Sequence, residues 1–190
     1  MIWVVALNSS IFDSFGISWL NYAKNFPNIS LHVADAGLHT HQKKLLQEHK
    51  VNLISVQSNS HFDVWTALLN ANLSDGTILY TTEHLKDPLE VIQRGKDRMV
   101  FLSLSDPEYY FLCKPIVSIT SQAMTANYVE KSMNLVASPV VVCGPAYWWK
   151  TMIGLTNAMR NSQPFYNGEG WEFLCVNLFA AAYPESIFLI

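Results

Sequence analysis

Residues 75–92, DGTILYTTEHLKDPLEVI, contain a short apolar run that ends abruptly in polar and ionisable residues. The run at residues 78–80 follows a glycine turn and consists of large or β-branched side chains, which predicts the end of a buried central strand. Polar residues occupy positions 81–84 directly afterwards. Because ligands of open α/β sheets bind in the crevice beyond the carboxyl ends of the strands, these four residues are the first candidates for a binding site.

Strand and helix patterns alternate along the rest of the chain. Apolar runs predict further strands at residues 2–7, 29–34, 51–56, 99–104, 116–119, 140–143 and 187–190. Apolar residues at helical spacing predict helices at residues 12–25, 41–50, 62–73, 89–93, 124–133, 146–159 and 172–182, with Thr40 as the N-cap of the second. This alternation implies βαβ units with right-handed crossovers, so we expect a three-layer α/β fold with a mainly parallel central sheet.

Length and composition are those of one folded domain. The 190 residues are enough for one well-buried domain and few for two, so residues 1–190 are expected to form a single domain. A composition that is 50% hydrophobic and 14% charged indicates a globular protein with a large core. The net charge of -3 argues against nucleic-acid binding, since phosphate recognition needs a basic surface. P-loop, GxGxxG, GxSxG and HExxH patterns are absent from the sequence.

The three cysteines, Cys113, Cys143 and Cys175, are widely spaced among apolar residues. An odd number in such surroundings predicts buried free thiols in a reducing compartment, and therefore a cytoplasmic protein. The first ten residues are too short to span a bilayer and lack the basic region of a signal peptide, so we expect no transmembrane segment there. The chain stops on an apolar strand-like run, which leaves open whether the natural product continues past Ile190.

Other polar residues also follow predicted strands. Asn8 and Ser9 come directly after the first strand, where they either donate hydrogen bonds to a base or sugar or only turn the chain. Asp35 closes the second strand. His39 and His41 lie in the next turn, and without a third ligand nearby a solvated surface is favoured over a metal site.

Three segments, VADAGLHTHQKKLLQEH (33–49), VWTALLNANLSDGTILYTTEHLKDPLEVI (64–92) and SPVVVCGPAYWWK (138–150), follow one another in an order and spacing that cover most of the chain. Together they resemble the GT-A class of nucleotide-sugar glycosyltransferases, especially the families related to glycogenin and the lipopolysaccharide galactosyltransferases. The second segment resembles the helix and strand that lead to the DxD motif of that class. The resemblance implies a central sheet of the nucleotide-diphospho-sugar transferase type.

In that class the two Asp of DxD hold a divalent cation that bridges the donor diphosphate, because hard oxygen ligands suit Mn or Mg. Here Thr82 and His84 stand at these positions, with Glu83 between them, so the motif is degenerate. A neutral Thr is a poor substitute for a carboxylate, whereas His84 can still ligate Mn. The alternative is that Thr82, Glu83 and His84 are only the polar end of a strand.

The resemblance also implies roles for residues elsewhere in the chain. Asn8 and Ser9 would hold the base, Asp35 would reach the nucleoside, and residues 82–84 would face the diphosphate. The downstream acidic residue that acts at the reacting carbon corresponds to Glu172 or, less directly, Glu169. Stabilisation of a helix N-terminus is the alternative role of Glu172.

Two further features concern the diphosphate and the acceptor. The helix before the motif has Trp65 and Thr66 where the class often carries a basic residue. Lysines that would supply the charge instead are Lys86, Lys114 and Lys150. Aromatic residues that would shape the sugar or acceptor pocket, because aromatic faces pack well on sugar C–H surfaces, are Tyr147, Trp148 and Trp171.

Three interpretations follow. The first is a glycosyltransferase that binds a nucleotide-diphospho-sugar and transfers the sugar to a glycan or small-molecule acceptor. The second is a non-catalytic relative that binds a nucleotide sugar or a glycan without transfer, favoured by the loss of both motif carboxylates. The third is an α/β interaction protein that uses exposed aromatic residues as a partner surface. We adopt the first as the expected function.

Overall fold

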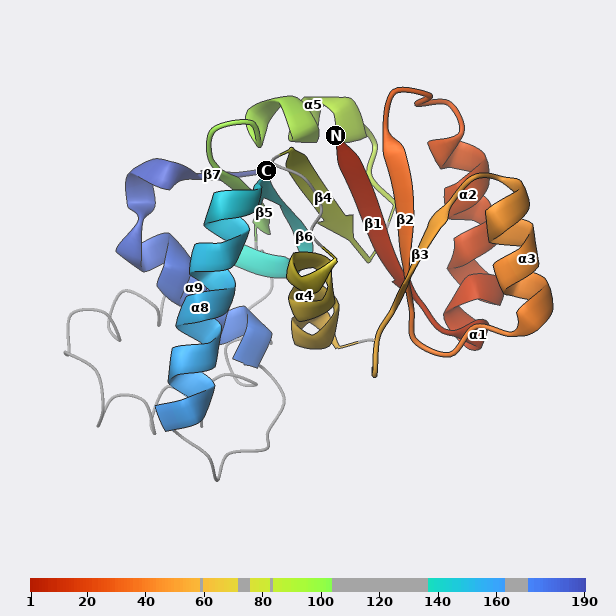
Figure 1. Cartoon of the computed structure of the whole chain (residues 1–190). Helices are drawn as coiled ribbons and strands as arrows, with labels where there is room; N and C mark the ends of the chain where they lie inside the picture. The colour runs from red at the N-terminus through yellow and green to blue at the C-terminus, as the bar shows by residue number, and fades with distance from the viewer. Residues whose placement is uncertain (59, 72–75, 83, 104–136, 163–170) are drawn as a thin grey trace.

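The computed structural model describes residues 1–58, 60–71, 76–82, 84–103, 137–162 and 171–190 (Figure 1). Within these residues a central sheet lies between two layers of helices. The predicted elements at residues 116–119 and 124–133 lie outside the described residues. The same holds for the individual residues Glu83, Cys113, Lys114 and Glu169.

The strands of the described sheet are β1 (Ile2–Leu7), β2 (Ser30–Asp35), β3 (Asn52–Ser55), β4 (Thr77–Thr81), β5 (Met99–Ser103), β6 (Ala137–Pro145) and β7 (Ile187–Leu189). Their spatial order is β3-β2-β1-β4-β6-β5-β7, and only the two pairs that contain β6 are antiparallel. The prediction of a mainly parallel sheet is confirmed. The sequence pattern does not reveal the reversed direction of β6, because composition and alternation are the same whichever way a strand runs.

The described helices are α1 (Ser9–Ile11), the π-helical turn η1 (Phe12–Gly16), α2 (Ile17–Ala23), α3 (Thr40–Glu48), α4 (His61–Asn70), α5 (Pro88–Arg94), α8 (Ala146–Ser162), α9 (Trp171–Ala182) and the 3-10 turn η2 (Pro184–Ser186). Residues of α2, α3 and α5 pack with one face of the sheet, and residues of α4, α8 and α9 pack with the other (Figure 1). The predicted three-layer arrangement is therefore confirmed.

The N-cap of α3 differs from the prediction. The helix begins at Thr40, so His39 rather than Thr40 is the capping residue. The side chain of Gln42 reaches back, and its Oε1 accepts a hydrogen bond from the His39 backbone N–H at 2.9 Å. Because Gln42 satisfies the first backbone donor of the turn, the helix starts one residue earlier than the threonine suggested.

The parallel strands end along one border of the sheet, which we call the polar edge. Leu7 at the end of β1 pairs with Asp35 at the end of β2, and Asp35 pairs with Ser55 at the end of β3. Thr81, at the end of β4, pairs with Val5 of β1. Residues that follow these strands therefore leave the sheet along the same border.

The reversed strand β6 decides where the last helices begin. Ala137 pairs with Ser103 at the end of β5, so β6 starts at the polar edge, and Pro145 pairs with Thr77 at the opposite edge. Helix α8 consequently begins at the opposite edge and runs toward the polar edge. Helix α9 packs against α8 and leads back to β7, which places the first turn of α9 at the polar edge (Figure 1).

The core consists of two apolar clusters, one on each face of the sheet. Trp3 and Trp19 are fully buried on the α2 face, and Trp65 and Trp149 are fully buried on the α4 face. Cys143 and Cys175 are both buried, as predicted, and the thiol of Cys143 is free. None of the described helices has the length and apolar character needed to cross a membrane.

Candidate functional site

The residues after β1 turn the chain into α1. Asn8 is the N-cap of α1, and its side-chain Oδ1 accepts a hydrogen bond from the Ile11 backbone N–H at 2.8 Å. Ser9 is half-buried, and its carbonyl oxygen accepts from Nε2 of Gln42 at 3.2 Å. The oxygen of the Asn8 side chain therefore serves the helix, and contact with a ligand at this loop would fall to the Asn8 amide nitrogen and the Ser9 hydroxyl.

Asp35 organises the turn between β2 and α3. One carboxylate oxygen accepts hydrogen bonds from the backbone N–H groups of Gly37 and Leu38, at 3.0 and 2.8 Å. The other oxygen pairs with Lys43 Nζ at 2.6 Å. Burial alone would raise the pKa of Asp35, but the Lys43 ammonium and the two backbone donors outweigh burial and lower it. Asp35 is thus a fixed anion at the polar edge.

The side chains at the end of β4 alternate between the two faces of the sheet. Thr81 is fully buried on the α2 face, where its Oγ1 accepts a hydrogen bond from Trp3 Nε1 at 3.0 Å. Tyr80 is fully buried in the cluster on the α4 face. Thr82 lies past the end of the strand with an exposed side chain, and its backbone N–H donates to the Val140 carbonyl oxygen at 3.0 Å.

His84 lies against the α2 side of the molecule. Its Nε2 is 2.9 Å from Ser18 Oγ, and its ring centroid is 4.8 Å from that of Phe15 and 6.4 Å from that of Tyr22. The chain continues along this face, where Tyr22 Oη donates to the Lys86 carbonyl oxygen at 2.8 Å. The contacts of His84 thus involve α2 and η1, whereas those of Asp35 involve the β2–α3 turn. In the described part of the chain, no group of three or more His, Cys, Asp or Glu residues could hold a metal ion.

Glu172 lies in the first turn of α9, and its charge acts on two groups that the sequence analysis did not select. His61 begins α4, and its Nδ1 is 2.9 Å from Tyr80 Oη. Burial lowers the pKa of His61 and raises the pKa of Tyr80, and the negative charge of Glu172 pushes both pKa values upward. The structure therefore adds His61 and Tyr80 to the predicted Glu172. No periodicity links three residues on separate elements, so the sequence holds no signal for this group.

Of the aromatic residues predicted to shape the acceptor pocket with Glu172, Tyr147 and Trp148 lie apart from it. Both residues lie in the first turn of α8, at the edge of the sheet opposite to Glu172. Tyr147 Oη donates to the Asp97 carbonyl oxygen at 3.2 Å, and the Trp148 ring centroid is 5.1 Å from that of Tyr183. The cause is the reversed direction of β6, which also carries Lys150 in α8 away from the start of α9.

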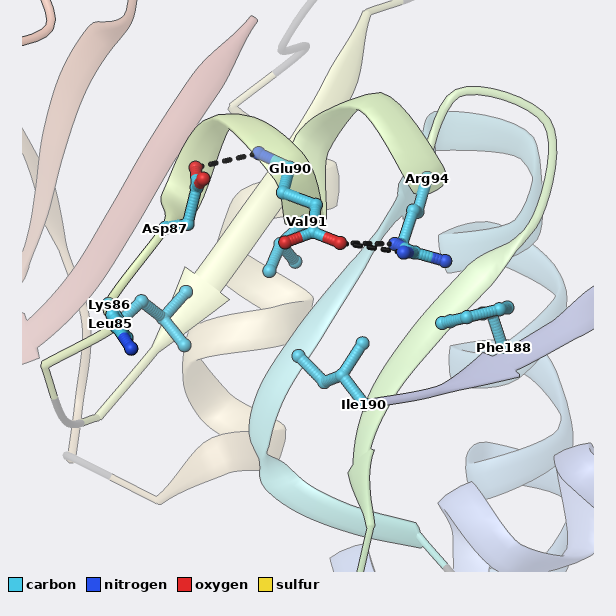
Figure 2. Close-up of a pocket in the computed structure, with 8 residues that line it drawn as sticks. All are labelled: Leu85, Lys86, Asp87, Glu90, Val91, Arg94, Phe188 and Ile190. Atoms are coloured by element: carbon cyan, nitrogen blue, oxygen red, sulfur yellow. Dashed lines mark hydrogen bonds and ion pairs between the residues drawn. The ribbon is translucent and has the colours of Figure 1, made fainter.

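Two cavities in the described part of the chain lie next to strands of the sheet and are candidate ligand sites. One, of about 290 Å³, lies beside the polar edge between the end of β3 and α4. It is lined by Ser55, Val56, Gln57, Phe62, Asp63, Thr66, Ala67 and Asn70. The other, of about 370 Å³, lies between α5 and β7 (Figure 2). Three of its charged residues make local contacts, since Glu90 binds Arg94 at 2.6 Å and Asp87 accepts from the Glu90 backbone N–H.

Comparison with solved structures shows that the fold is similar to that of several glycosyltransferases. The galactosyltransferase LgtC, solved with donor and acceptor sugar analogs, matches 100% of this chain and 73% of its own chain, with a TM-score of 0.56 and 13% sequence identity. An active-site mutant of LgtC matches with a TM-score of 0.55 and 11% identity, over 100% of this chain and 72% of its own. The glycosyltransferase GlyE of Streptococcus pneumoniae TIGR4 matches with a TM-score of 0.59 and 10% identity, over 100% of this chain and 44% of its own.

Sequence comparisons give no relatives, because no family model and no curated protein matches the chain. The identities to the solved structures are low, so the likeness is one of fold.

Proposed function

We propose that the protein binds a nucleotide-diphospho-sugar at the polar edge and transfers the sugar to a glycan or small-molecule acceptor. The observation that carries the proposal is the match of the whole chain to LgtC, a galactosyltransferase solved with donor and acceptor sugar analogs. The ends of β1, β2 and β4 and the first turn of α9 supply polar groups along that edge. A reducing, cytoplasmic location is part of the proposal, and the buried free thiol of Cys143 supports it.

Under this proposal the polar residues divide between the two halves of the donor. The Asn8 amide nitrogen and the Ser9 hydroxyl contact the base. Asp35 acts on the nucleoside by holding Lys43 and the β2–α3 turn in place, since both of its oxygens already have partners. Thr82 presents an exposed hydroxyl beside the diphosphate.

Transfer breaks the bond between the anomeric carbon and a diphosphate oxygen and forms a bond from that carbon to an acceptor hydroxyl. The electron pair of the broken bond leaves with the diphosphate, and the proton of the acceptor hydroxyl must go to a base. Glu172 is the candidate base, because its carboxylate lies at the polar edge among groups that respond to its negative charge.

The described residues are a poor donor set for a resident Mn or Mg ion. Thr82 is neutral, and His84 is bonded to Ser18. We therefore assign no step to a metal. Binding of Mn through His84 stays a prediction, and the ligand-binding experiment below includes it.

A second candidate function is binding of a nucleotide sugar or glycan without transfer. The observation that favours it is the presence of Thr82 and His84 where the class carries two Asp. The third interpretation, an interaction protein, predicts no response to nucleotide sugars at all.

Thermal unfolding with a panel of UDP-sugars tests the proposal. At a ligand concentration of about 100 times Kd, stabilisation of about 2.7 kcal/mol should raise Tm by roughly 5–10 °C. Ser9→Glu should abolish the shift by charge repulsion, whereas the control Asn52→Glu, at the start of β3 on the opposite edge, should keep it.

The same panel is repeated with EDTA and with Mn, and release of UDP is measured in each case. A shift that grows with Mn and shrinks in His84→Ala would establish the metal prediction. A shift without release of UDP in the presence of acceptors would favour the binding protein. The absence of any shift across a broad panel of nucleotide sugars would refute the proposal.

A further inference from the structure

One buried glutamine connects the two loops that follow β1 and β2 at the polar edge. Gln42 lies in the first turn of α3 and is only 1% exposed, although glutamine is a polar residue. Its Nε2 donates hydrogen bonds to the Ser9 carbonyl oxygen at 3.2 Å and to Asp13 Oδ1 at 2.9 Å. Its Oε1 accepts from the His39 backbone N–H at 2.9 Å. The amide group therefore joins the turn after β1, the π-helical turn η1 and the turn after β2.

The three partners leave one orientation for the amide group of Gln42. The His39 N–H is a donor and needs an acceptor, whereas the Ser9 carbonyl and the Asp13 carboxylate are acceptors and need donors. A reversed amide would set its oxygen against two other oxygens and its nitrogen against an N–H group. Both N–H donors of Gln42 are thus used inside the protein. A buried amide with its donors paired favours one geometry of its neighbours, because a broken bond leaves a buried polar group without a partner.

A backbone hydrogen bond also links the two loops, closer to the sheet. The Leu7 carbonyl oxygen accepts from the Ala36 N–H at 2.9 Å, directly after the last paired residues of β1 and β2. This bond holds the loops where they leave the strands. Gln42 adds a side-chain link farther along both loops, at Ser9 on one side and His39 on the other.

The π-helical turn that carries Asp13 is packed closely against the end of β1. It interrupts the helical run between α1 and α2, and single π-helical turns of this kind occur frequently at functional sites. A Cβ added at Gly16 would come within 3.1 Å of Leu7 Cδ1 and 2.9 Å of Phe12 Cδ2, so the turn requires a glycine there. Asp13 therefore accepts the Gln42 N–H from a backbone whose place beside β1 is fixed.

We infer that Gln42 is a positioning residue for the nucleoside half of the donor, and that it keeps the β1–α1 loop and the β2–α3 turn at one separation. The inference rests on the proposed function, which gives the base to the loop after β1 and the nucleoside to the turn that Asp35 holds. Gln42 acts through the loops, because its amide group is buried and its donors are taken. Without the amide, the loops hold the binding geometry for a smaller fraction of the time, and the apparent affinity falls by that fraction.

The link is tested first without a ligand, by NMR hydrogen exchange of backbone amides. Gln42→Met keeps an unbranched side chain of similar length but removes the amide, so the His39 N–H should exchange faster. The control is Leu46→Val, which removes a buried methylene group one turn later in α3 and leaves all three hydrogen bonds in place. Exchange at His39 that is the same in Gln42→Met as in the wild type would contradict the inference.

Ligand binding then separates positioning from stability, with uridine and UDP as the probes and calorimetry as the measurement. We expect Gln42→Met to raise Kd for both probes by the same factor, about 10-fold, because the loss lies in the nucleoside that they share. Leu46→Val should bind both probes as the wild type does, since it loses stability but keeps the loops joined. With a donor that is turned over, Gln42→Met should raise KM and leave kcat nearly unchanged.

An exchanged pair of substitutions tests the hydrogen bond between Gln42 and Asp13. Gln42→Glu removes both donors and sets a carboxylate against Asp13, so Kd should rise at least as much as in Gln42→Met. Asp13→Asn combined with Gln42→Glu restores a bond between these positions with donor and acceptor exchanged, and it should recover part of the lost affinity. Asp13→Ala changes an exposed position, and it should raise Kd by a smaller factor. This variant supplies the test if those of Gln42 do not fold.

An unchanged Kd in Gln42→Met and Asp13→Ala, or an equal rise in Leu46→Val and Gln42→Met, would overturn the inference, while binding of UDP by the wild type would uphold the proposed function. If the wild type binds no nucleotide sugar, the proposed function fails, and the inference fails with it even where exchange at His39 is as expected. The two failures are therefore distinguishable.

Discussion

The two faces of β4 carry different kinds of polar pair close to the polar edge of the sheet. On the α2 face, Thr81 accepts a hydrogen bond from the indole of Trp3, and both partners are fully buried. On the α4 face, Tyr80 Oη lies 2.9 Å from His61 Nδ1, and the charge of Glu172 raises the pKa of both groups. The first pair contains no group that gains or loses a proton near neutral pH. The second pair joins a buried phenol to the half-buried imidazole of His61, which can titrate.

The difference separates polar groups that specify the fold from polar groups that can respond to a ligand. A neutral buried pair contributes a satisfied hydrogen bond and a fixed geometry. In a pair that includes a histidine under the influence of a carboxylate, protonation of one group also changes the pKa of the other. We therefore expect variants of Trp3 and Thr81 to change stability alone, and variants of Tyr80 and Trp65 to change both stability and the protonation of His61.

The largest effects are expected from two buried tryptophans, Trp3 within the first pair and Trp65 next to the second. Trp3→Ala and Trp65→Ala each remove a fully buried ring and should lower the free energy of unfolding by about 3–5 kcal/mol, measured by urea titration. Only Trp65→Ala should change the NMR signals of His61. Where an alanine variant does not fold, the Phe variant of the same residue supplies the comparison. A change in His61 caused by the Trp3 variant would erase the distinction between the faces.

Removal of single hydroxyl groups should give a smaller effect. Thr81→Val leaves the buried indole N–H of Trp3 without its partner and should cost about 1–3 kcal/mol. Tyr80→Phe removes the donor to His61 Nδ1 and should cost about 0.5–1.5 kcal/mol. Urea unfolding measures both losses, and NMR should show an altered His61 tautomer in Tyr80→Phe alone. The same tautomer in all three proteins would mean that Tyr80 does not fix the ring.

Acid should lower the free energy of unfolding through protonation of His61, which lies on the α4 face. Burial lowers the pKa of this group from 6.5, against the charge of Glu172, so the unfolded chain binds its proton more readily than the folded one. The free energy of unfolding should therefore keep its full value above pH 6.5 and fall as the pH drops below that value. Glu172→Gln should steepen the fall, because the folded pKa of His61 is lower without the carboxylate. Urea unfolding at a series of pH values measures the effect, with His32→Gln as the variant that removes the parallel contribution of His32.

The smallest effect is expected away from both faces of β4, on the surface of α5. Glu90 and Arg94 form an exposed ion pair one helical turn apart at 2.6 Å (Figure 2). Glu90→Gln should cost about 0.3–0.5 kcal/mol, and the loss should shrink in high salt. Thermal unfolding at low and high NaCl measures it. A loss above that of Thr81→Val would show that this surface, rather than the interior beside β4, dominates the local stability.

Much of the architecture could be predicted because apolar and polar patterns within short segments of the sequence indicate it. The continuous apolar run of β1 indicates a strand covered on both faces, and all six of its residues are buried. The polar end of β4 and the acidic first turn of α9 also followed from local sequence. The expectation that Thr82 and His84 face a diphosphate came from a family resemblance, and it remains a prediction.

Other features depended on how distant segments meet. The direction of β6 placed Tyr147 at the edge opposite to Glu172, although both residues were predicted in helices that the structure contains. His61 lies in a polar stretch that resembles any loop end, and nothing in its neighbours indicates Tyr80 or Glu172 as partners.

The sequence by itself determined the alternation of strands and helices, the buried thiols of Cys143 and Cys175 and the polar residues at the strand ends, because these follow from the apolar periodicity of short segments. Only the tertiary structure decided which ionisable groups share one place. Strand direction and helix packing bring together residues far apart in the chain, and pKa values respond to that spatial proximity rather than to sequence distance.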